Sequence, residues 1–442
     1  IDEHDAAEAL LDSELMRLPR HDGRIDLPHL RRRAVGHHLD LLIDRGRNDD
    51  AFRVARRSRS RFARSLLRSV DDEALQRTGF LDRRDAIDAQ LATSADWSGG
   101  HLRRLQADAA RDLALLRSEL DAVMAGGRPI TVVDRQPVDG ELSLTVHPGE
   151  ASWWLFASSV DGIDVFRLDD LDALFDQQRD GTGNPDQLAE EWADRLLTPV
   201  AARLRAARSV RFLAYGVLHA IDLHALPFDG APLIEQVTVA YGVDLPTVKR
   251  DGELGPSVVI GDPSGDLAAA RNEAAQVFRL LQPFGAIHHL DGLAATGAVV
   301  RQHLDGADHV HYAGHAHFAG WDSHLLLADG SSLTVDDILA LRRPPRTVVL
   351  ASCEAGRAVA AGGRETFDLA RAFATAGSTA VIAATRPVSD EVTGRLMSTL
   401  YDAWTGSGGL TGDAAAALRQ AQRRLRETDP DADWAAFRLI ER

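Results

Sequence analysis

Two residues whose types could perform nucleophilic catalysis follow two predicted strands. His315 comes after the apolar run HVHY, and Cys353, the only cysteine of the chain, comes after the run TVVLAS. An imidazole beside a thiol can take its proton, favour the reactive thiolate and later protonate a leaving amine. The pair therefore indicates a nucleophile and its base, although a lone cysteine can also be a small buried apolar residue.

The segment between these residues indicates that they lie at one edge of a sheet. Residues 316–352 read as a loop, a helix and a return strand, which is long enough for a crossover between two parallel neighbours. His315 and Cys353 would then both stand at carboxyl ends of adjacent strands, where open α/β sheets place their ligand crevice. We therefore expect the imidazole and the thiol to meet there.

The periodicity of the chain predicts how these strands are held. Residues 1–127 repeat apolar positions at helical spacing, which indicates an all-helical region with a degenerate helical-repeat character. Residues 128–442 begin with short β-type runs that predict antiparallel strands, including a hairpin at Asp161-Gly162, and continue as alternating strands and helices. This pattern predicts an α/β fold with a mostly parallel sheet flanked by helices, divided into 128–250 and a catalytic half, 251–442. The run GDAAAALRQAQRRLRET is expected to close the chain as a helix.

Charge and composition exclude several classes of partner. The formal net charge is -16, and it falls almost wholly on residues 128–442. Such a surface repels nucleic acid and anionic lipid. The Arg-rich segment 53–68 is interpreted as an amphipathic helix with a solvated face. No apolar run is long enough for a membrane span, the N-terminus is too acidic for a signal peptide, and a single cysteine fits a cytoplasmic location.

A cluster of histidines suggests an alternative chemistry. His309, His311, His315 and His317 alternate in HVHYAGHAH and could bind a transition metal. Metal hydrolases with this spacing usually add an aspartate inside the cluster, and none lies between His309 and His317. We therefore predict no metal and no cofactor, and keep a metal-dependent hydrolase as an alternative hypothesis.

Several segments together resemble a known family. HYAGHA, SHLLLADGSSLTVDDI, VVLASCEAG and AVIAATRPVSDEVT follow one another in the order typical of the CHAT peptidases, bacterial relatives of caspases and separase. The resemblance covers roughly residues 128–442. It implies a caspase-like fold and a cysteine endopeptidase that acts on a protein substrate through the dyad of His315 and Cys353. It also implies an oxyanion hole formed by the N–H groups of Ala316 and Cys353.

The sequence departs from the family pattern at three positions. Ala316 replaces the usual glycine after the histidine, Arg386 stands where an aromatic residue is common, and Asp222 stands where a proline is usual. A Cβ at position 316 would crowd the oxyanion hole if that position required a glycine-only conformation. The departures at Ala316 and Arg386 support an alternative hypothesis, a catalytically weak or inactive interaction scaffold.

Relatives of caspases that cut after arginine suggest a substrate pocket with an acidic residue. Asp390 follows the strand AVIAA, and Asp262 follows the strand VVIG. Either carboxylate could pair with a guanidinium, although Asp390 could instead cap a helix and Asp262 could stabilise a turn. We expect cleavage after a basic residue. The helical region 1–127 would recruit a substrate or sensor protein, or hold the peptidase inactive. The resemblance to the family implies a role in regulated proteolysis or bacterial defence.

Overall fold

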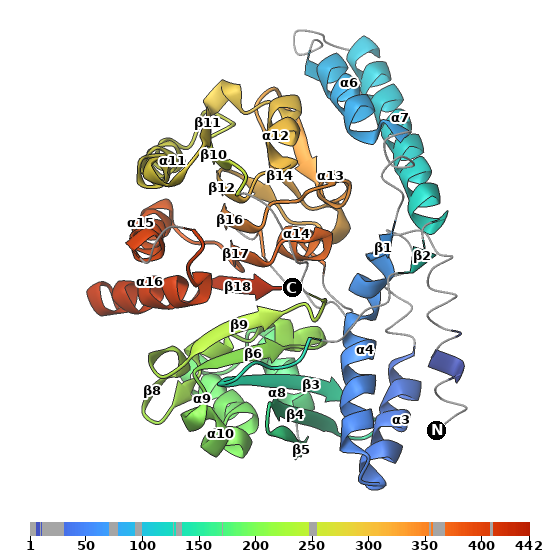
Figure 1. Ribbon diagram of the computed structural model, residues 1–442, viewed down its shortest axis with the longest axis vertical. Helices are drawn as coiled ribbons and strands as arrows, with labels where there is room; N and C mark the ends of the chain where they lie inside the picture. Colours follow the sequence, from blue (N-terminus) through green and yellow to red (C-terminus); the bar gives the residue numbers. More distant parts are fainter. Residues whose placement is uncertain are drawn as a thin grey trace.

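A large sheet organises the molecule. The computed structural model describes residues 6–8, 10, 31–69, 78–92, 100–126, 128–129, 135–169, 171–246, 254–352, 355–356, 367–406 and 410–442. Within these residues, eleven strands form a single twisted sheet (Figure 1). In spatial order they are β11 (Ile287–Asp291), β10 (Ser257–Gly261), β12 (His309–Ala313), β16 (Thr347–Ala351), β17 (Ala380–Ala384), β18 (Phe437–Glu441), β9 (Thr238–Gly242), β6 (Ser209–Leu213), β3 (Glu141–Pro148), β4 (Trp153–Ser159) and β5 (Gly162–Leu168).

Neighbouring strands are parallel along most of this sheet. All pairs from β11 to β17 are parallel, as are the pairs that link β18, β9, β6 and β3. Antiparallel pairing joins β17 to β18 and builds the β3–β4–β5 meander. The mostly parallel α/β fold and the early antiparallel strands are thus confirmed, and Asp161-Gly162 lies at the turn of the β4–β5 hairpin. One sheet runs through both predicted halves of residues 128–442.

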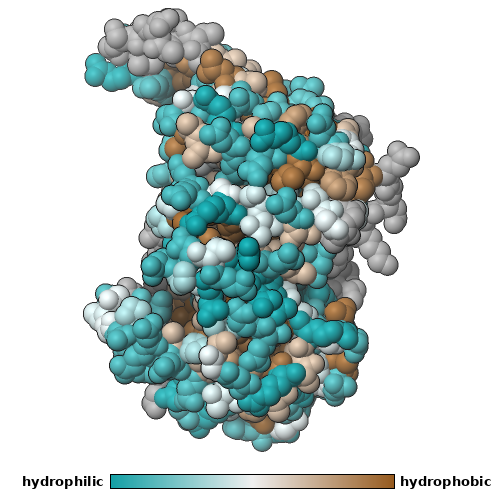
Figure 2. Space-filling model, turned by 90° about the vertical axis from the view of Figure 1, so that its left-hand side faces the viewer, coloured by the Kyte–Doolittle hydropathy of each residue, from teal (hydrophilic) through white to brown (hydrophobic). Residues whose placement is uncertain are grey.

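The central parallel strands are buried on both faces, as their unbroken apolar runs predict. In β16, Val348 and Leu350 pack on one face, while Val349 and Ala351 pack on the other. The first face is covered by α4 (Asn48–Leu66), α12 (Gly297–Leu304), α13 (Val335–Leu339) and α14 (Leu369–Ala376). The second face is covered by α11 (Ala268–Leu281), α15 (Asp390–Gly406) and α16 (Ala414–Thr428). The outer surface of α11, α15 and α16 is mainly hydrophilic, with apolar side chains in scattered patches (Figure 2).

The other end of the sheet is also covered on both faces. Leu155 and Ala157 of β4 pack with α8 (Leu171–Asp180), α9 (Pro185–Leu196) and α10 (Ala201–Ala206). Phe156, between them in β4, packs with α3 (Arg32–Asp44) and α4. The helix α4 therefore contributes to the apolar cluster on the central strands as well as to the one on β4, and it lies beside β3 and β5 (Figure 1).

The prediction that the arginines of segment 53–68 face solvent is wrong for three of them. Arg56, Arg59 and Arg61 in α4 are no more than 4% exposed. Nε of Arg56 donates to Oδ2 of Asp244 at 2.9 Å, and Nη1 of Arg59 donates to the carbonyl oxygen of Gly242 at 3.1 Å. The helix lies on the sheet, and the countercharge comes from a loop far along the chain that local charge patterning does not reveal.

Two further helices form a unit that we name the α6–α7 hairpin. It consists of α6 (Phe80–Ala92) and α7 (Gly100–Gly126), which pack against each other. Phe80 and Leu116 share an apolar cluster with Ala340, which directly follows α13. The hairpin is thus docked on residues 251–442.

The chain closes with a strand, which corrects the expected terminal helix. The run GDAAAALRQAQRRLRET does form α16, but β18 follows it and enters the sheet between β17 and β9. Phe437, Leu439 and Ile440 of β18 are buried, so a short apolar run at the end of the sequence completes the core. Among the described residues, no helix is long and apolar enough to cross a membrane.

Candidate active site

The turn that carries His315 is fixed by the strand before it. Oη of Tyr312, in β12, lies 2.7 Å from the carbonyl oxygens of both His315 and Leu326. A Cβ at Gly314 would lie 2.7 Å from that Oη and 2.9 Å from Cδ of Pro263. Only glycine fits between these groups, so the sequence AGHA produces one sharp turn that leads the histidine out of the sheet.

The imidazole of His315 is partly exposed and has an acidic neighbour. Its Nε2 lies 3.2 and 3.3 Å from the two carboxylate oxygens of Asp266, and 42% of the His315 side chain is exposed. The hydroxyl of Ser264 donates to Asp266, and this hydrogen bond, followed by the contact with His315, lowers the pKa of Asp266. Asp266 can therefore orient the ring and stabilise its protonated form.

Ala316 occupies an ordinary extended position. It lies in β13 (Ala316–His317) and pairs with Leu325 of β14 (His324–Leu326), which in turn pairs with β15 (Ser332–Thr334). Among the described residues, the non-glycine residues with positive φ are Asp229, Asp244, Asp262 and Asp329. Ala316 is not one of them, so its backbone conformation does not require glycine.

A cavity of about 120 Å³ opens at the carboxyl ends of β12, β16 and β17. His315 and Ala316 line it together with Ser352, the residue that directly precedes Cys353. The parallel pairing of β12 with β16 brings these two strand ends together, as predicted. Cys353 lies outside the described residues, and its thiol and N–H are therefore not placed here.

The two carboxylates predicted for a substrate pocket have different environments. Asp390 is exposed, lines the cavity and begins α15, while the hydroxyl of Ser389 accepts the N–H of Val392 and so caps that helix. Asp262 is fully buried and accepts hydrogen bonds from Nη2 of Arg271 at 2.6 Å and from the N–H of Leu267 at 2.9 Å. Asp390 thus faces the cavity, whereas the carboxylate of Asp262 is used within the fold.

The histidine cluster does not converge on one point. His309 and His311 are buried on the face covered by α11 and α15, whereas His315 and His317 follow the end of β12. Within the described part of the chain, no group of three histidine, aspartate or glutamate side chains could hold a metal ion. The alternative hypothesis of a metal-dependent hydrolase built on His309–His317 is therefore wrong. Alternation along one strand brings His309 and His311 together, but the turn at Gly314 directs His315 and His317 away from them.

Comparison with known proteins decides the family. The model of the CHAT domain matches residues 186–442, more than half of the chain. The chain belongs to the CHAT family. A search among curated proteins gave no match.

Solved structures with a similar chain trace include two peptidases. The CHAT chain is similar to the Arg-specific cysteine proteinase gingipain R, with 11% identity, a TM-score of 0.41 and coverage of 62% of this chain and 74% of the proteinase. A complex of the pro- and mature domains of that proteinase from Porphyromonas gingivalis gives 13% identity, a TM-score of 0.42 and coverage of 61% and 75%. The Saccharomyces cerevisiae separase–securin complex gives 11% identity, a TM-score of 0.40 and coverage of 89% of this chain but 25% of separase.

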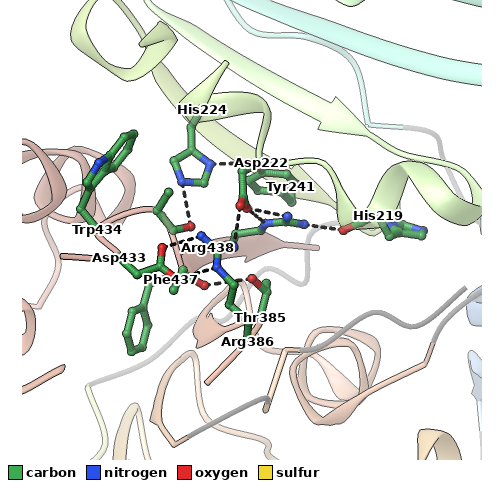
Figure 3. Close-up of polar contacts among 12 residues, drawn as sticks. His219, Asp222, His224, Tyr241, Thr385, Arg386, Asp433, Trp434, Phe437 and Arg438 are labelled. Carbon is green, nitrogen blue, oxygen red and sulfur yellow. Dashed lines mark hydrogen bonds and ion pairs between the residues drawn. The ribbon is translucent and has the colours of Figure 1, made fainter. Parts of the chain in front are cut away.

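Two departures of this CHAT domain from the family pattern contact each other. Nη1 of Arg386 lies 2.5 Å from Oδ2 of Asp222, and its other nitrogens pair with Asp433 at 2.6 Å (Figure 3). Nε of Arg438, in β18, donates to the other oxygen of Asp222 at 2.8 Å. Burial would raise the pKa of Asp222, but the guanidinium groups of Arg438 and Arg386 outweigh it and hold that pKa at about 2. Arg386 therefore belongs to an ion cluster that anchors the loop between β17 and α15.

Sequence reasoning missed two acidic residues of the CHAT site. Asp266 approaches His315, and Glu273 of α11 lines the cavity although only 6% of its side chain is exposed. Both lie in GDPSGDLAAARNEA, which the sequence identifies as a turn followed by a helix. The sequence did contain a signal for Glu273, because this residue lies on the apolar face of that helix, one residue before the buried Ala274. A charged residue at such a position is rare without a partner or a function.

Proposed function

We propose that this CHAT protein is a cysteine endopeptidase with Cys353 as nucleophile and His315 as its general base and acid. One observation carries the proposal: His315 and Ser352, the residue before the only cysteine, line the same cavity at the carboxyl edge of the sheet. Asp266 approaches Nε2 of the imidazole, which leaves Nδ1 to exchange a proton with the thiol.

The reaction would proceed through an acyl-enzyme. His315 takes the thiol proton, and the thiolate of Cys353 attacks the carbonyl carbon of the scissile bond. The N–H groups of Ala316 and Cys353 stabilise the oxyanion, and the C–N bond breaks as the imidazolium protonates the leaving amine. Water, deprotonated by His315, then attacks the thioester and releases the acid and the thiol.

The cavity supports a preference for a basic residue before the cut. Asp390 provides a carboxylate at its exposed rim, and Glu273 provides one that is almost wholly buried. A guanidinium that enters the cavity would form charge-assisted hydrogen bonds with them. A protein substrate with an exposed arginine is the partner that this chemistry recognises.

We expect an arginyl peptide carrying a thiol-reactive acyloxymethyl ketone to label Cys353 at least tenfold faster than the same probe with citrulline. Citrulline keeps the shape of arginine but lacks its charge. Hydrogen bonds to charged groups contribute about 1.5–3 kcal/mol, which corresponds to a factor of roughly ten to a hundred. Asp390→Asn, at the exposed rim, should reduce the ratio about tenfold, and Glu273→Gln should reduce it by up to about a hundredfold.

Mass spectrometry of the labelled chain measures both rates. Labelling of Cys353 that does not distinguish the two probes would contradict the basic specificity but not the nucleophile. If a folded protein showed no labelling of Cys353 by either probe, the cysteine mechanism itself would be wrong, and the scaffold hypothesis would take its place.

The α6–α7 hairpin supports regulation by the N-terminal region. Nη2 of Arg301, a buried residue of α12, lies 2.7 Å from Oδ2 of Asp88, and its guanidinium also pairs with Asp85 of α6 and contacts the carbonyl oxygen of Ser332. Ser332 begins β15, in the three-stranded sheet whose other edge carries Ala316. The docked hairpin thus supports the sheet that extends from His315, and a partner protein that displaced the hairpin would alter the site.

We expect the double variant Asp85→Asn, Asp88→Asn to undock the hairpin and slow the labelling of Cys353. It removes two of the carboxylates around a buried guanidinium, which is strongly unfavourable. Hydrogen exchange over residues 80–126, measured beside the labelling rate, should increase. Asp108→Asn, which affects an exposed ion pair on α7, is the matched control. Undocking with an unchanged labelling rate would exclude the hairpin as a regulator.

A further inference from the structure

A chain of buried polar groups runs beneath β12, between the sheet and the helices α11 and α15. Oγ1 of Thr347 lies 2.8 Å from Nδ1 of His309, whose Nε2 lies 2.7 Å from Oη of Tyr401. The same Oη lies 3.1 Å from Nδ1 of His311. Nε2 of His311 lies 3.1 Å from Oε1 of Glu273, within ion-pair distance but without hydrogen-bond geometry, and neither atom has a hydrogen-bond partner in the described residues.

The two ends of this chain reach two different cavities. Glu273 lines the candidate active-site cavity. Thr347 and His309 line a second cavity of about 370 Å³, at the opposite edge of the sheet where the parallel strands begin. The polar groups between them are buried, so no solvent exposure supplies alternative partners for His311 and Tyr401. The hydrogen bonds of these two side chains therefore have to be satisfied by the other buried polar groups of the protein.

The number of protons on each group determines which group donates and which accepts along this row of buried polar groups. A neutral imidazole has one N–H and one lone pair that accepts, and a phenol has one O–H. Burial, with a smaller contribution from His311, lowers the pKa of His309 to about 3, so this ring is neutral. Burial and then the charge of Glu273 raise the pKa of Tyr401 well above its ordinary value, so the phenol keeps its proton.

One direction satisfies the three hydrogen bonds and turns a proton toward Glu273. Thr347 donates to Nδ1 of His309, Nε2–H of His309 donates to Tyr401, and the O–H of Tyr401 donates to Nδ1 of His311. The Nε2–H of His311 is then the group nearest to the carboxylate of Glu273, whose Oε1 lies 3.1 Å from that nitrogen. In the reverse direction the lone pair of His311 would face that carboxylate, and the other acceptor for Thr347, the carbonyl oxygen of Asp308, is at 3.5 Å, the outer limit of a hydrogen bond.

We propose that Tyr401 and His311 are positioning residues that orient the carboxylate of Glu273 for the basic residue of the substrate. This inference rests on the proposed peptidase function, because it assigns a role within that substrate pocket. Tyr401 and His311 do not reach the cavity themselves. They act through Glu273, whose carboxylate lies 3.1 Å from Nε2 of His311 and which lines the cavity that would admit the substrate cation.

The first test is Tyr401→Phe, which removes one oxygen and keeps the ring. We expect kcat/KM for an arginyl peptide to fall about fivefold, the effect of one hydrogen bond, with the loss in KM and with kcat unchanged. The citrulline peptide should be cleaved as by the wild type. In a Glu273→Gln background, Tyr401→Phe should have no further effect, since the residue through which it acts is gone.

The matched control is Tyr241→Phe. Tyr241 is also buried and its hydroxyl lies 2.7 Å from Nδ1 of His224, but it is in β9, and neither residue lines the cavity. A merely structural effect of losing a buried tyrosine–histidine hydrogen bond would lower the cleavage of both peptides in both variants. That outcome, or additive effects of Tyr401→Phe and Glu273→Gln, would overturn the proposal.

The second test does not depend on peptidase activity. In the full chain labelled with ¹⁵N-histidine, the signals, assigned with His309→Gln and His311→Gln, should show His309 as a neutral ring protonated at Nε2 and His311 protonated at Nε2. Protonation of His311 at Nδ1 alone would overturn the proposed direction. If the wild type cleaves no peptide but these tautomers are found, the peptidase function fails while the buried chain stands. If the wild type cleaves the peptide but the tautomers differ, the proposed hydrogen-bond direction fails while the peptidase function stands.

Discussion

Cys353→Ala is expected to abolish peptide cleavage while leaving the fold intact. The thiolate is the only proposed bond-forming group, and the sequence contains no second cysteine that could replace it. Alanine is smaller than cysteine, so the cost to folding should be modest. His315→Ala should be almost as damaging, with a loss of about 10²–10⁴-fold, the usual contribution of a positioned general base. Combining the two changes should cost little more than Cys353→Ala alone, because the dyad acts as a unit.

A matched histidine serves as the control for this prediction. His317 lies two residues beyond His315, in β13, and is exposed, so His317→Ala should cleave at nearly the wild-type rate. Cleavage of an arginyl peptide, with circular dichroism to verify folding, measures all four variants. Full activity in folded Cys353→Ala would exclude the cysteine mechanism. Nearly full activity in folded His315→Ala would exclude His315 as the general base.

The parts of the site that sequence could predict follow from short-range rules. The crossover between His315 and Cys353 required two parallel neighbours, and β12 does pair with β16. The next strand along, β17, lies beside β16 for the same reason and places Asp390 at the cavity. Connectivity and strand direction alone determine these positions.

The remaining parts depend on contacts between distant segments. β18 enters between β17 and β9, a choice that no local pattern specifies. Glu273 reaches the cavity because α11 packs with that face inward, and α4 buries Arg56 because Asp244 stands opposite. Whether a charged side chain can be buried depends on its partner, and the partner is distant in sequence, so local patterns do not identify it.

The departures at Asp222 and Arg386 illustrate this limit. Taken singly, each residue is a change from the family pattern, and Arg386 supported the scaffold hypothesis. They are separated by 164 positions in sequence, yet their side chains form an ion pair that also includes Arg438. The two side chains thus pair with each other, and charged contacts anchor the loop that leads to Asp390. The scaffold hypothesis therefore loses its support from Arg386, and Ala316 has an ordinary backbone conformation.

Asp222→Asn is expected to destabilise the protein by about 3 kcal/mol near neutral pH, the lower end of the cost of breaking a buried ion pair. The buried guanidinium of Arg438 loses its carboxylate partner, although it keeps the carbonyl oxygen of His219, and Arg386 keeps Asp433. Urea unfolding measures the change. Asp229→Asn, which removes an exposed partner of Arg205, should have little effect and is the matched control.

The dependence on pH distinguishes lost charge from altered packing. The folded-state pKa of Asp222, about 2, is below the usual 3.9 of an unfolded aspartate, so its charge stabilises the fold above pH 4 and this contribution disappears as the pH falls toward 2. The shift corresponds to roughly 2.5 kcal/mol. The difference in unfolding free energy between the wild type and Asp222→Asn should therefore shrink by about that amount between pH 7 and pH 2, in whatever range both remain folded. A difference that stayed constant as the pH fell would mean that asparagine harms packing and that the ion cluster does not hold the loop. An Arg386→Gln change should likewise cost much less in the Asp222→Asn background than alone, because the two side chains share one interaction.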